Sequence, residues 1–416
     1  MRIKDIAAIN AKTKTKFDSA IAYYDTASVI EGHILEPQII DPSTEKIPSR
    51  AQRIIKDKTI LYSTVRPYLR HFGIIEKPSE NAIASTGFVT IDAKEEIVNP
   101  FYLYYWLTRD EITSYLNTIA ASSVSSYPSI NPKDIYDIAI DLPTMDEQER
   151  IASILRCIDA KIRVNNKIIK TSEKLMREIY DYWFVQFDFP DENGRPYKSS
   201  GGKMKWNEKL KREIPEGWVV KPLEEYITVV RGISYKPADE LKEESANSVS
   251  LLKSNNIQDG AINYDQPVFL PAELVGSGQW LTKGSVFIAM SSGSKAHMGK
   301  TAIVYKDLPY TFGAFCAKIN IDTKATVYLS TYFTSEWFRA YIENVTAGTS
   351  INNIGNEQLT NIPLPFPDDM LQKRFEEYLE PIFDELGELN EENRRLTSLR
   401  DWLLPMLMNG QIKVSD

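Results

Sequence analysis

Apolar and polar positions alternate along this chain in an order that occurs twice. IAYYDTASVIEGHI (residues 21–34) contains an apolar strand, a polar turn and Gly32 before a final Ile, and VSLLKSNNIQDGAI (residues 249–262) repeats this layout with Gly260. Further segments match in the same order: residues 58–70 and 284–295, 82–91 and 310–319, 100–116 and 326–342, 120–130 and 346–354, and 138–143 and 361–367. We interpret the pattern as a domain duplication, because solenoid repeats have periods of only about 20–50 residues.

Each copy is followed by a charged segment whose apolar residues recur three and four positions apart, which predicts a long helix with a heptad seam. The first helix is expected from 146 to about 187, and Pro381 is expected to interrupt and kink the second. The predicted seam residues are Ile151, Leu155, Ile158, Ile162, Asn165 and Ile169 in the first helix, and Leu386, Leu389, Asn393 and Leu396 in the second.

A polar residue in a seam costs stability but fixes register. Asn165 and Asn393 are therefore expected to face each other in an antiparallel helix pair, or else to tilt toward solvent near the ends of the contact. A helix over 146–187 would be about 60 Å long at 1.5 Å per residue. Such helices suit spacers between the two domains, and a plain dimerisation coiled coil is the alternative.

These patterns predict an α+β fold, with two homologous α/β domains separated by two long antiparallel coiled-coil helices. The polar, glycine-rich stretch between the halves predicts a loop or linker. The expected boundaries are 1–145 for the first domain, 146–187 for the first spacer helix, 188–215 for the linker, 216–368 for the second domain and 369–416 for the second spacer helix.

The formal net charge of −8 argues mildly against nucleic-acid binding, because phosphate neutralisation supplies much of that affinity. The acidic residues concentrate in 146–149, 239–244 and 376–392, however, and short basic stretches lie elsewhere. That distribution fits a protein that contacts DNA with one face and partner proteins with another.

The chain is expected to be a cytoplasmic protein with no membrane span. It contains no run of about 18 apolar residues, and its first residues lack an apolar run of signal-peptide length. Cys157 and Cys316 make no disulfide framework, and both are expected to be small buried apolar side chains.

Motifs for catalysis are incomplete. GSKAHMGKT (residues 293–301) has five residues where a P-loop has four, and a strand-like segment follows it. NPFY (residues 99–102) lacks the second proline of an amino-methyltransferase motif, and the histidines are scattered without zinc spacing. We therefore expect no catalytic residue, no metal site and no cofactor bound by this chain.

Polar loops at equivalent places in the two copies are the candidates for reading DNA, and Lys12–Lys16 suits phosphate. His71 and His297 fall at comparable places, and exposed turns without function are the alternative for every loop. The candidate DNA-binding residues are Lys12, Lys14, Lys16, Ser63, Arg66, Tyr68, Arg70, His71, Ser123, Ser125, Ser126, Tyr127, Ser292, Ser294, Lys295, His297, Lys300, Thr349, Ser350, Asn352 and Asn353.

Four segments together resemble the specificity subunits of type I restriction–modification systems, and the resemblance covers essentially the whole chain. The most specific features are Glu147-Gln148 before an apolar heptad, Trp183–Val185 at a helix end and Pro215–Trp218 before a strand. The segments are LPTMDEQERIASILRCIDAKI (142–162), LMREIYDYWFVQFD (175–188), EIPEGWVVKPLEEY (213–226) and LRDWLLPMLMNGQIKV (399–414).

The resemblance implies two target-recognition domains in pseudo-twofold arrangement, each entering the major groove of double-stranded DNA and reading one half of a bipartite, asymmetric site. The helix segments Gln148–Trp183 and Gln372–Trp402 would set the gap and dock two modification subunits, which carry S-adenosylmethionine. Restriction subunits would supply ATP- and Mg²⁺-dependent translocation and cleavage. This chain would then be a non-catalytic subunit.

Two other functions remain open at this point. One is a coiled-coil adaptor without DNA binding, and the other is a DNA methyltransferase with degenerate motifs. The second helix also departs from the first, because Leu371-Gln372 stands where the first has Glu147-Gln148, so its opening is expected to dock differently.

Overall fold

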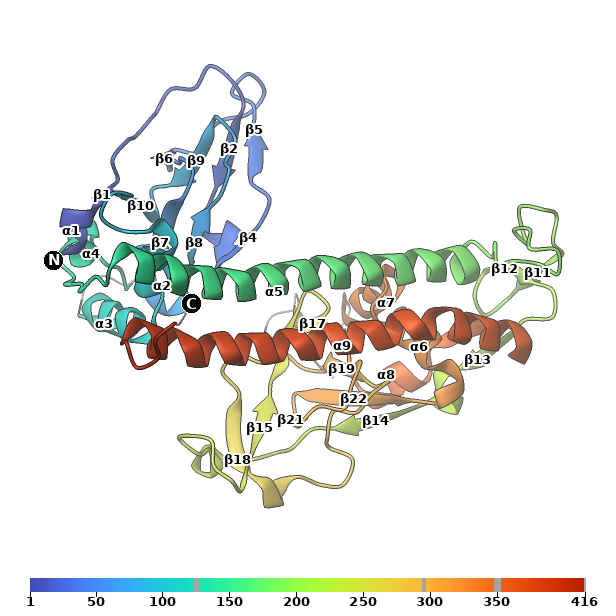
Figure 1. Ribbon diagram of the computed structural model, residues 1–416. Helices are drawn as coiled ribbons and strands as arrows, with labels where there is room; N and C mark the ends of the chain where they lie inside the picture. The colour runs from blue at the N-terminus through green and yellow to red at the C-terminus, as the bar shows by residue number, and fades with distance from the viewer. Residues whose placement is uncertain (123–127, 294–296, 348–352, 415–416) are drawn as a thin grey trace. The chain divides into compact units, whose positions relative to one another are not determined.

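The structure is a computed structural model that describes residues 1–122, 128–293, 297–347 and 353–414. The chain divides into two compact units, Met1–Arg163 with Arg395–Asp416, and Val164–Arg394. Two long helices, α5 (Met145–Tyr180) and α9 (Asp369–Met408), each contribute residues to both units (Figure 1).

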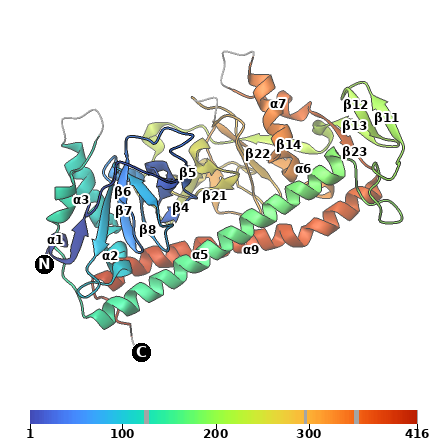
Figure 2. The same cartoon turned by 90° about the horizontal axis from the view of Figure 1, so that it is seen from above.

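In the described residues of the first unit, the β-rich part contains two four-stranded sheets and a two-stranded sheet of β3 and β4 (Figures 1 and 2). One four-stranded sheet has the antiparallel order β1-β10-β7-β8, and the other has the order β5-β2-β9-β6, in which β2 and β9 run parallel. The strands are β1 (Ala7–Ile9), β2 (Ile21–Tyr24), β3 (Val29–Ile30), β4 (His33–Ile34), β5 (Gln38–Ile40), β6 (Ala51–Ile54), β7 (Thr59–Ser63), β8 (Phe72–Ile75), β9 (Ala82–Ser85) and β10 (Phe88–Ala93).

Helix α2 (Pro100–Leu107) has every side chain buried, and it shares one core with residues of α1, α3 and α4. A helix that is apolar on all sides belongs in a core. Here the core also contains Leu155 of α5 and Leu407 of α9, so both long helices close it. The other helical elements are α1 (Ile3–Ile6), η1 (Thr26–Ser28), η2 (Pro67–Leu69), α3 (Asp110–Ala121) and α4 (Pro132–Tyr136).

The second unit repeats this design. One sheet has the order β14-β22-β19-β20 and another has β18-β15-β21, in which β15 and β21 run parallel. Its strands are β11 (Met204–Asn207), β12 (Arg212–Pro215), β13 (Val219–Pro222), β14 (Ile227–Arg231), β15 (Ser248–Leu252), β16 (Ile257–Gln258), β17 (Ala261–Ile262), β18 (Val268–Pro271), β19 (Val286–Ala289), β20 (Thr301–Ile303), β21 (Tyr310–Phe312), β22 (Cys316–Ile321) and β23 (Pro363–Phe366).

Helices follow the strands of the second unit in the same order as in the first. α6 (Thr326–Phe333), α7 (Glu336–Ala347) and α8 (Asn356–Thr360) correspond to α2, α3 and α4. The predicted duplication and the α+β fold class are confirmed. The remaining helical elements are η3 (Asp181–Val185), η4 (Leu223–Glu225), η5 (Pro237–Asp239), η6 (Ser254–Asn256), η7 (Ala272–Leu274) and η9 (Thr323–Ala325).

The repeated glycine follows from backbone geometry. Gly32 has φ +81° in the β3–β4 turn and Gly260 has φ +83° in the β16–β17 turn. Residues with a Cβ rarely adopt this left-handed conformation. A Cβ at Gly32 would also lie 2.5 Å from the hydroxyl oxygen of Tyr104 in α2.

The long helices pack together in antiparallel fashion, and the two seam asparagines meet. In the second unit Asn165 Nδ2 donates to Asn393 Oδ1 at 3.0 Å, and Asn393 Nδ2 donates to Asn166 Oδ1 at 2.7 Å. Asn165 is completely buried. Of the other seam residues, Ile151, Leu155, Ile158, Ile162 and Leu386 are buried, and Ile169, Leu389 and Leu396 are half-buried.

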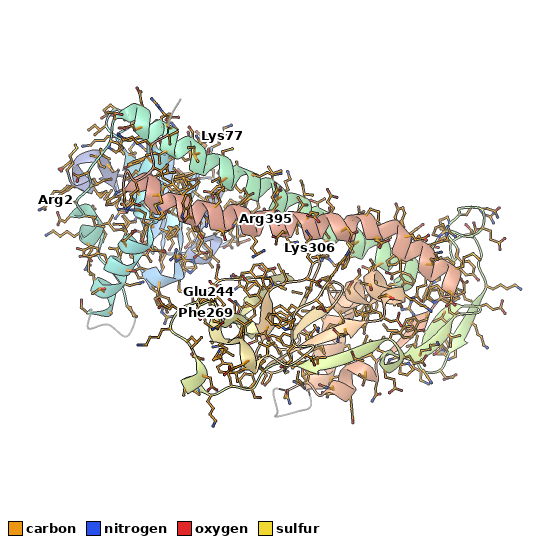
Figure 3. All side chains as sticks on the ribbon, turned by 60° about the horizontal axis from the view of Figure 1, so that its bottom comes forward. Arg2, Lys77, Glu244, Phe269, Lys306 and Arg395 are labelled. Atoms are coloured by element: carbon orange, nitrogen blue, oxygen red, sulfur yellow. The ribbon has the colours of Figure 1, made fainter. Side chains whose placement is uncertain are left out.

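The second β-rich domain is fixed to the middle of α9 by polar and steric contacts. Lys306 Nζ lies 2.7 Å from a carboxylate oxygen of Glu388, and Lys283 Nζ lies 2.7 Å from one of Asp384 (Figure 3 labels Lys306 beside α9). Between these acids, a Cβ on Gly387 would lie 3.0 Å from the carbonyl oxygen of Tyr305. Glycine therefore allows the chain after β20 to lie directly on the helix.

Several local expectations are wrong. α9 continues through Pro381 without interruption, and Phe375, Leu379 and Phe383 bury its inner face against the core, which compensates for the lost backbone hydrogen bond. Cys157 is exposed, because its position in α5 lies off the apolar seam, whereas Cys316 is buried as expected.

The segment expected to be a loop or linker contains the β11–β12 hairpin. Phe187, Phe189 and Trp218 at its ends pack on one another, with Phe189 and Trp218 stacked at 5.4 Å between ring centroids. The strand expected at 138–143 is reduced to a single bridge between Arg2 and Ala139, whereas its counterpart β23 pairs with β13 along its length.

The glutamine at the start of each long helix binds the backbone of its own domain. Gln148 Oε1 accepts the N–H of Asn99 at 2.8 Å, and Gln372 Nε2 donates to the carbonyl of Lys324 at 2.8 Å. Both side chains are buried. The glutamine that the two copies share at this point therefore has a structural role, since it joins each long helix to the start of α2 or α6.

The two copies cap these equivalent helices differently. In the first, Asn99 Oδ1 accepts the N–H groups of Phe101 and Tyr102. In the second, Ala325 stands at the N-cap and offers no acceptor, and Glu376 of α9 accepts the N–H groups of Val327 and Tyr328 instead.

Burial raises the pKa of Glu376 to about 7, from an ordinary value near 4.5, although the two N–H donors partly oppose this shift. An acid whose pKa is raised by folding stabilises the fold below its unfolded pKa and loses that contribution as pH rises through the folded value. Part of the stability of the second unit should thus be lost between about pH 4.5 and 8, by at most roughly 3 kcal/mol.

Glu376→Gln should flatten that part of the stability-against-pH curve, measured by urea unfolding at pH values from 5 to 8. Glu385→Gln, at an exposed position of the same helix, is the matched control and should keep the wild-type slope. Equal slopes for Glu376→Gln and the wild type would contradict the assignment.

Candidate nucleic-acid interface

The structure brings the two predicted loops of the first domain together. Ile130 N–H donates to the carbonyl of Thr64 at 2.9 Å, Arg66 N–H donates to that of Pro128 at 2.9 Å, and Val65 and Ser129 form a bridge. The connection between β7 and β8 therefore lies beside residues 128–130. We call this place the first loop junction (residues 63–71 and 128–130).

The second domain repeats the junction with different residues. Ile354 N–H donates to the carbonyl of Met290 at 2.8 Å, and Ser291 and Asn353 form the bridge that corresponds to Val65 and Ser129. We call this place the second loop junction (described residues 290–293, 297–300, 353 and 354). The same kind of backbone pairing thus assembles both candidate sites.

Backbone pairing also fixes which residues correspond. Ser63 N–H donates to the carbonyl of His71 at 2.8 Å, and Ala289 N–H donates to that of Lys300 at 2.9 Å. His71 therefore corresponds to Lys300, and the expected equivalence of His71 and His297 is wrong. Counting residues from the strands misses this, because the second loop is longer than the first.

A rigid turn carries the exposed side chains of the first junction. Arg66 and Arg70 flank η2 with φ values of 47° and 53°, in the left-handed region that residues with a Cβ rarely adopt. Arg70 is held by carboxylates of Glu31, at 3.4 Å, and Asp110. Strained turns persist only where the surroundings fix them, and they cluster at functional sites.

Three predicted DNA-binding residues support this turn. Ser63 is only 2% exposed and donates to the carbonyl of Val65 at 3.1 Å, so its assignment as a DNA contact is wrong. The positive charge of Arg70 is paired with Glu31 and Asp110 of the same domain. His71 Nδ1 lies 2.8 Å from the carbonyl oxygen of Val29, which fixes its ring.

Other predicted residues are accessible. Lys12, Lys14 and Lys16 are exposed between β1 and β2, and Tyr68 is 49% exposed on η2. His297 and Asn353 are exposed, and Arg66, Ser292 and Lys300 are half-exposed. The predicted residues Ser123, Ser125, Ser126, Tyr127, Ser294, Lys295, Thr349, Ser350 and Asn352 lie outside the described residues.

The sequence prediction did not include two accessible apolar residues at the junctions, Leu69 and Phe315. Leu69 is 42% exposed beside Tyr68, and Phe315 is 70% exposed beside Ser291. Phe315 could have been found, because the alignment of residues 310–319 with 82–91 places it opposite Gly87.

Metal ligands and a reactive thiol are the catalytic groups to consider in the described ranges of the chain. Within them no cluster of three or more His, Cys, Asp or Glu side chains has the geometry to hold a metal ion. Burial raises the pKa of the Cys316 thiol to about 12, which disfavours the thiolate that a nucleophile requires. None of the helices in these ranges is long and apolar enough to cross a membrane.

The fold and the two junctions define a class of protein: an α+β subunit with two homologous β-rich domains and two long helices packed together. The model of the type I restriction modification DNA specificity domain matches residues 1–174 and 215–397. The chain belongs to this family. It is the DNA specificity subunit, the non-catalytic part, of a type I restriction–modification complex. The alternative that the chain is a DNA methyltransferase with degenerate motifs is therefore wrong.

Relatives of this family match along most or part of the chain. The HindI specificity subunit of Haemophilus influenzae is 22% identical over 94% of each chain. The EcoKI specificity subunit of Escherichia coli is 35% identical over 37% of this chain and 34% of its own. The crystal structure of the type I S subunit from M. genitalium covers 98% of this chain and 95% of its own, with a TM-score of 0.54 and 14% identity, and shows the same fold.

Proposed function

We propose that each β-rich domain reads one half of a bipartite, asymmetric target in double-stranded DNA through its loop junction. The observation that carries this proposal is that both domains build the same backbone junction but present different side chains there. Tyr68 and Arg66 stand out from one, and His297, Lys300 and Asn353 from the other. Different side chains at equivalent places recognise different bases.

Phosphate contacts would position the domains without reading sequence. Lys12, Lys14 and Lys16 suit this role in the first domain, because all are exposed on the connection between β1 and β2. They supply positive charge locally, so the net negative charge of the whole chain does not exclude binding to DNA.

The partner subunits would dock on the outer faces of the long helices. Val164, Ile168, Leu175 and Tyr182 are 54%, 38%, 43% and 38% exposed. Their spacing of 4, 7 and 7 residues places them on one helical face, away from the buried seam. We call this face, which continues from α5 into η3 at Tyr182, the α5 outer stripe. An exposed apolar stripe beside polar residues is typical of a protein interface.

The corresponding face of α9 carries Leu399 and Trp402, which are 44% and 54% exposed. Two equivalent helix faces would accept two modification subunits, and these would carry S-adenosylmethionine and transfer methyl groups. Restriction subunits would supply ATP- and Mg²⁺-dependent translocation and cleavage. This chain would itself bind no cofactor, and it would act in the cytoplasm, where these partners meet DNA.

The test is genome-wide mapping of adenine methylation in cells that express the cognate modification subunit with and without this chain. A two-part methylated motif that depends on the chain is expected. Unchanged methylation, with the modification subunit shown to be present, would favour an adaptor that binds no DNA. Direct duplex binding by the assembled complex would then be measured as a function of salt.

A further inference from the structure

Phe315 has an unusual position for an apolar side chain. It lies in the turn between β21 and β22 and is 70% exposed. A single exposed apolar residue needs no explanation by itself. The location of this one does, because it stands at the second loop junction.

The backbone of Phe315 is held from two sides while its side chain is not. Its carbonyl accepts the N–H groups of Met290 at 2.9 Å and Ser291 at 3.0 Å. The neighbouring Ala314 N–H donates to the carbonyl of Ile233 at 2.9 Å. Ser291 in turn bridges to Asn353, so Phe315 lies beside the residues proposed to read DNA.

At the position equivalent to Phe315 the first domain has Gly87, which carries no side chain. Thr64 N–H donates to the carbonyl of Gly87 at 2.9 Å, which is the contact that Met290 makes with Phe315 in the second domain. A Cβ on Gly87 would lie 2.9 Å from Cγ2 of Thr26, so a larger side chain at that position would require Thr26 to move. The two junctions therefore differ in apolar character at one defined point.

We infer that Phe315 is a specificity-determining residue that contacts the 5-methyl group of a thymine in the half-site read by the second domain. This inference rests on the proposed function. The thymine methyl is the apolar group on the base edges of the major groove, and side chains such as Phe contact it. A ring on a fixed turn loses little conformational freedom when it binds there.

The experiment uses the assembled complex of this chain with its modification subunits and a duplex that carries the methylated motif. Each thymine of the motif is replaced in turn by deoxyuridine, which lacks only the methyl group. At one of these positions the replacement should weaken DNA binding by the wild-type complex roughly three- to fivefold. This loss corresponds to the free energy of burying about one methyl group. Phe315→Ala should bind the unmodified duplex equally weakly and should not respond to that replacement.

Phe315→Leu should recover part of the response, and Trp206→Ala should keep the wild-type response, because Trp206 is 53% exposed on the β11–β12 hairpin. The inference is overturned if no thymine responds in the wild type, or if Phe315→Ala keeps the wild-type response at every thymine. Failure of the wild-type complex to distinguish the motif from a scrambled duplex would instead overturn the proposed function as well.

Discussion

The double substitution Ile168→Glu and Leu175→Glu is expected to abolish assembly with the modification subunits while the chain stays folded. Both side chains are exposed, so their replacement creates no cavity. In an assembled interface each of the two new glutamates would place an unpaired carboxylate in an apolar contact. Truncation of a hot-spot residue at the centre of an interface costs about 2 kcal/mol or more, so the loss of two such residues should weaken binding by about 4 kcal/mol, roughly a thousandfold.

Binding is measured by titration of the purified modification subunit, and motif methylation in cells provides a second readout. The matched control makes the same chemical changes at Leu35 and Ile39, which are 59% and 65% exposed in the first β-rich domain. Those changes should leave assembly intact. If the α5 outer stripe variant assembles like wild type, the docking face lies elsewhere.

Phe375→Ala is expected to give the largest loss of stability. Phe375 of α9 is fully buried, and its ring lies 4.7 Å from that of Phe184 and 5.4 Å from that of Trp183, measured between centroids. Tyr328 of α6 completes the cluster. Truncation of a buried Phe to Ala costs about 3–5 kcal/mol, because transfer energy is lost and a cavity remains.

For a unit of this size the melting temperature should fall by roughly 10 °C in calorimetry. Tyr378→Ala is the control one turn away: Tyr378 stacks on Trp183 but is 63% exposed, so it should change the melting temperature by only a few degrees. Equal effects of the two substitutions would show that the cluster does not hold α9 to the end of α5 and to α6.

The duplication and the long helices could be predicted from the sequence because both depend on periodicity, which the sequence displays directly. The seam from Ile151 to Ile162 is buried as the heptad pattern indicates. Asn165 and Asn393 could be matched for the same reason, since their places in two antiparallel seams determine where they meet.

The details of the site could not be predicted because they depend on contacts between distant segments. Ser63 looks like an accessible polar residue, yet strand pairing buries it. Arg70 looks like a DNA contact, yet Asp110, forty residues later in the chain, neutralises it. Likewise, the sequence gives no sign that Glu376 replaces the missing cap at Ala325, because the donor and the acceptor come from different helices.

The loop junctions have a consequence for how new specificities can arise. In each domain the described contacts that join the two loops are made by backbone N–H and carbonyl groups, as between Ile130 and Thr64 or Ile354 and Met290. Such bonds do not depend on which side chains are present. Substitutions at the exposed positions of a junction should therefore alter the target while leaving the melting temperature nearly unchanged. Affinity selection on these positions alone could redesign one half of the target, with the other half kept.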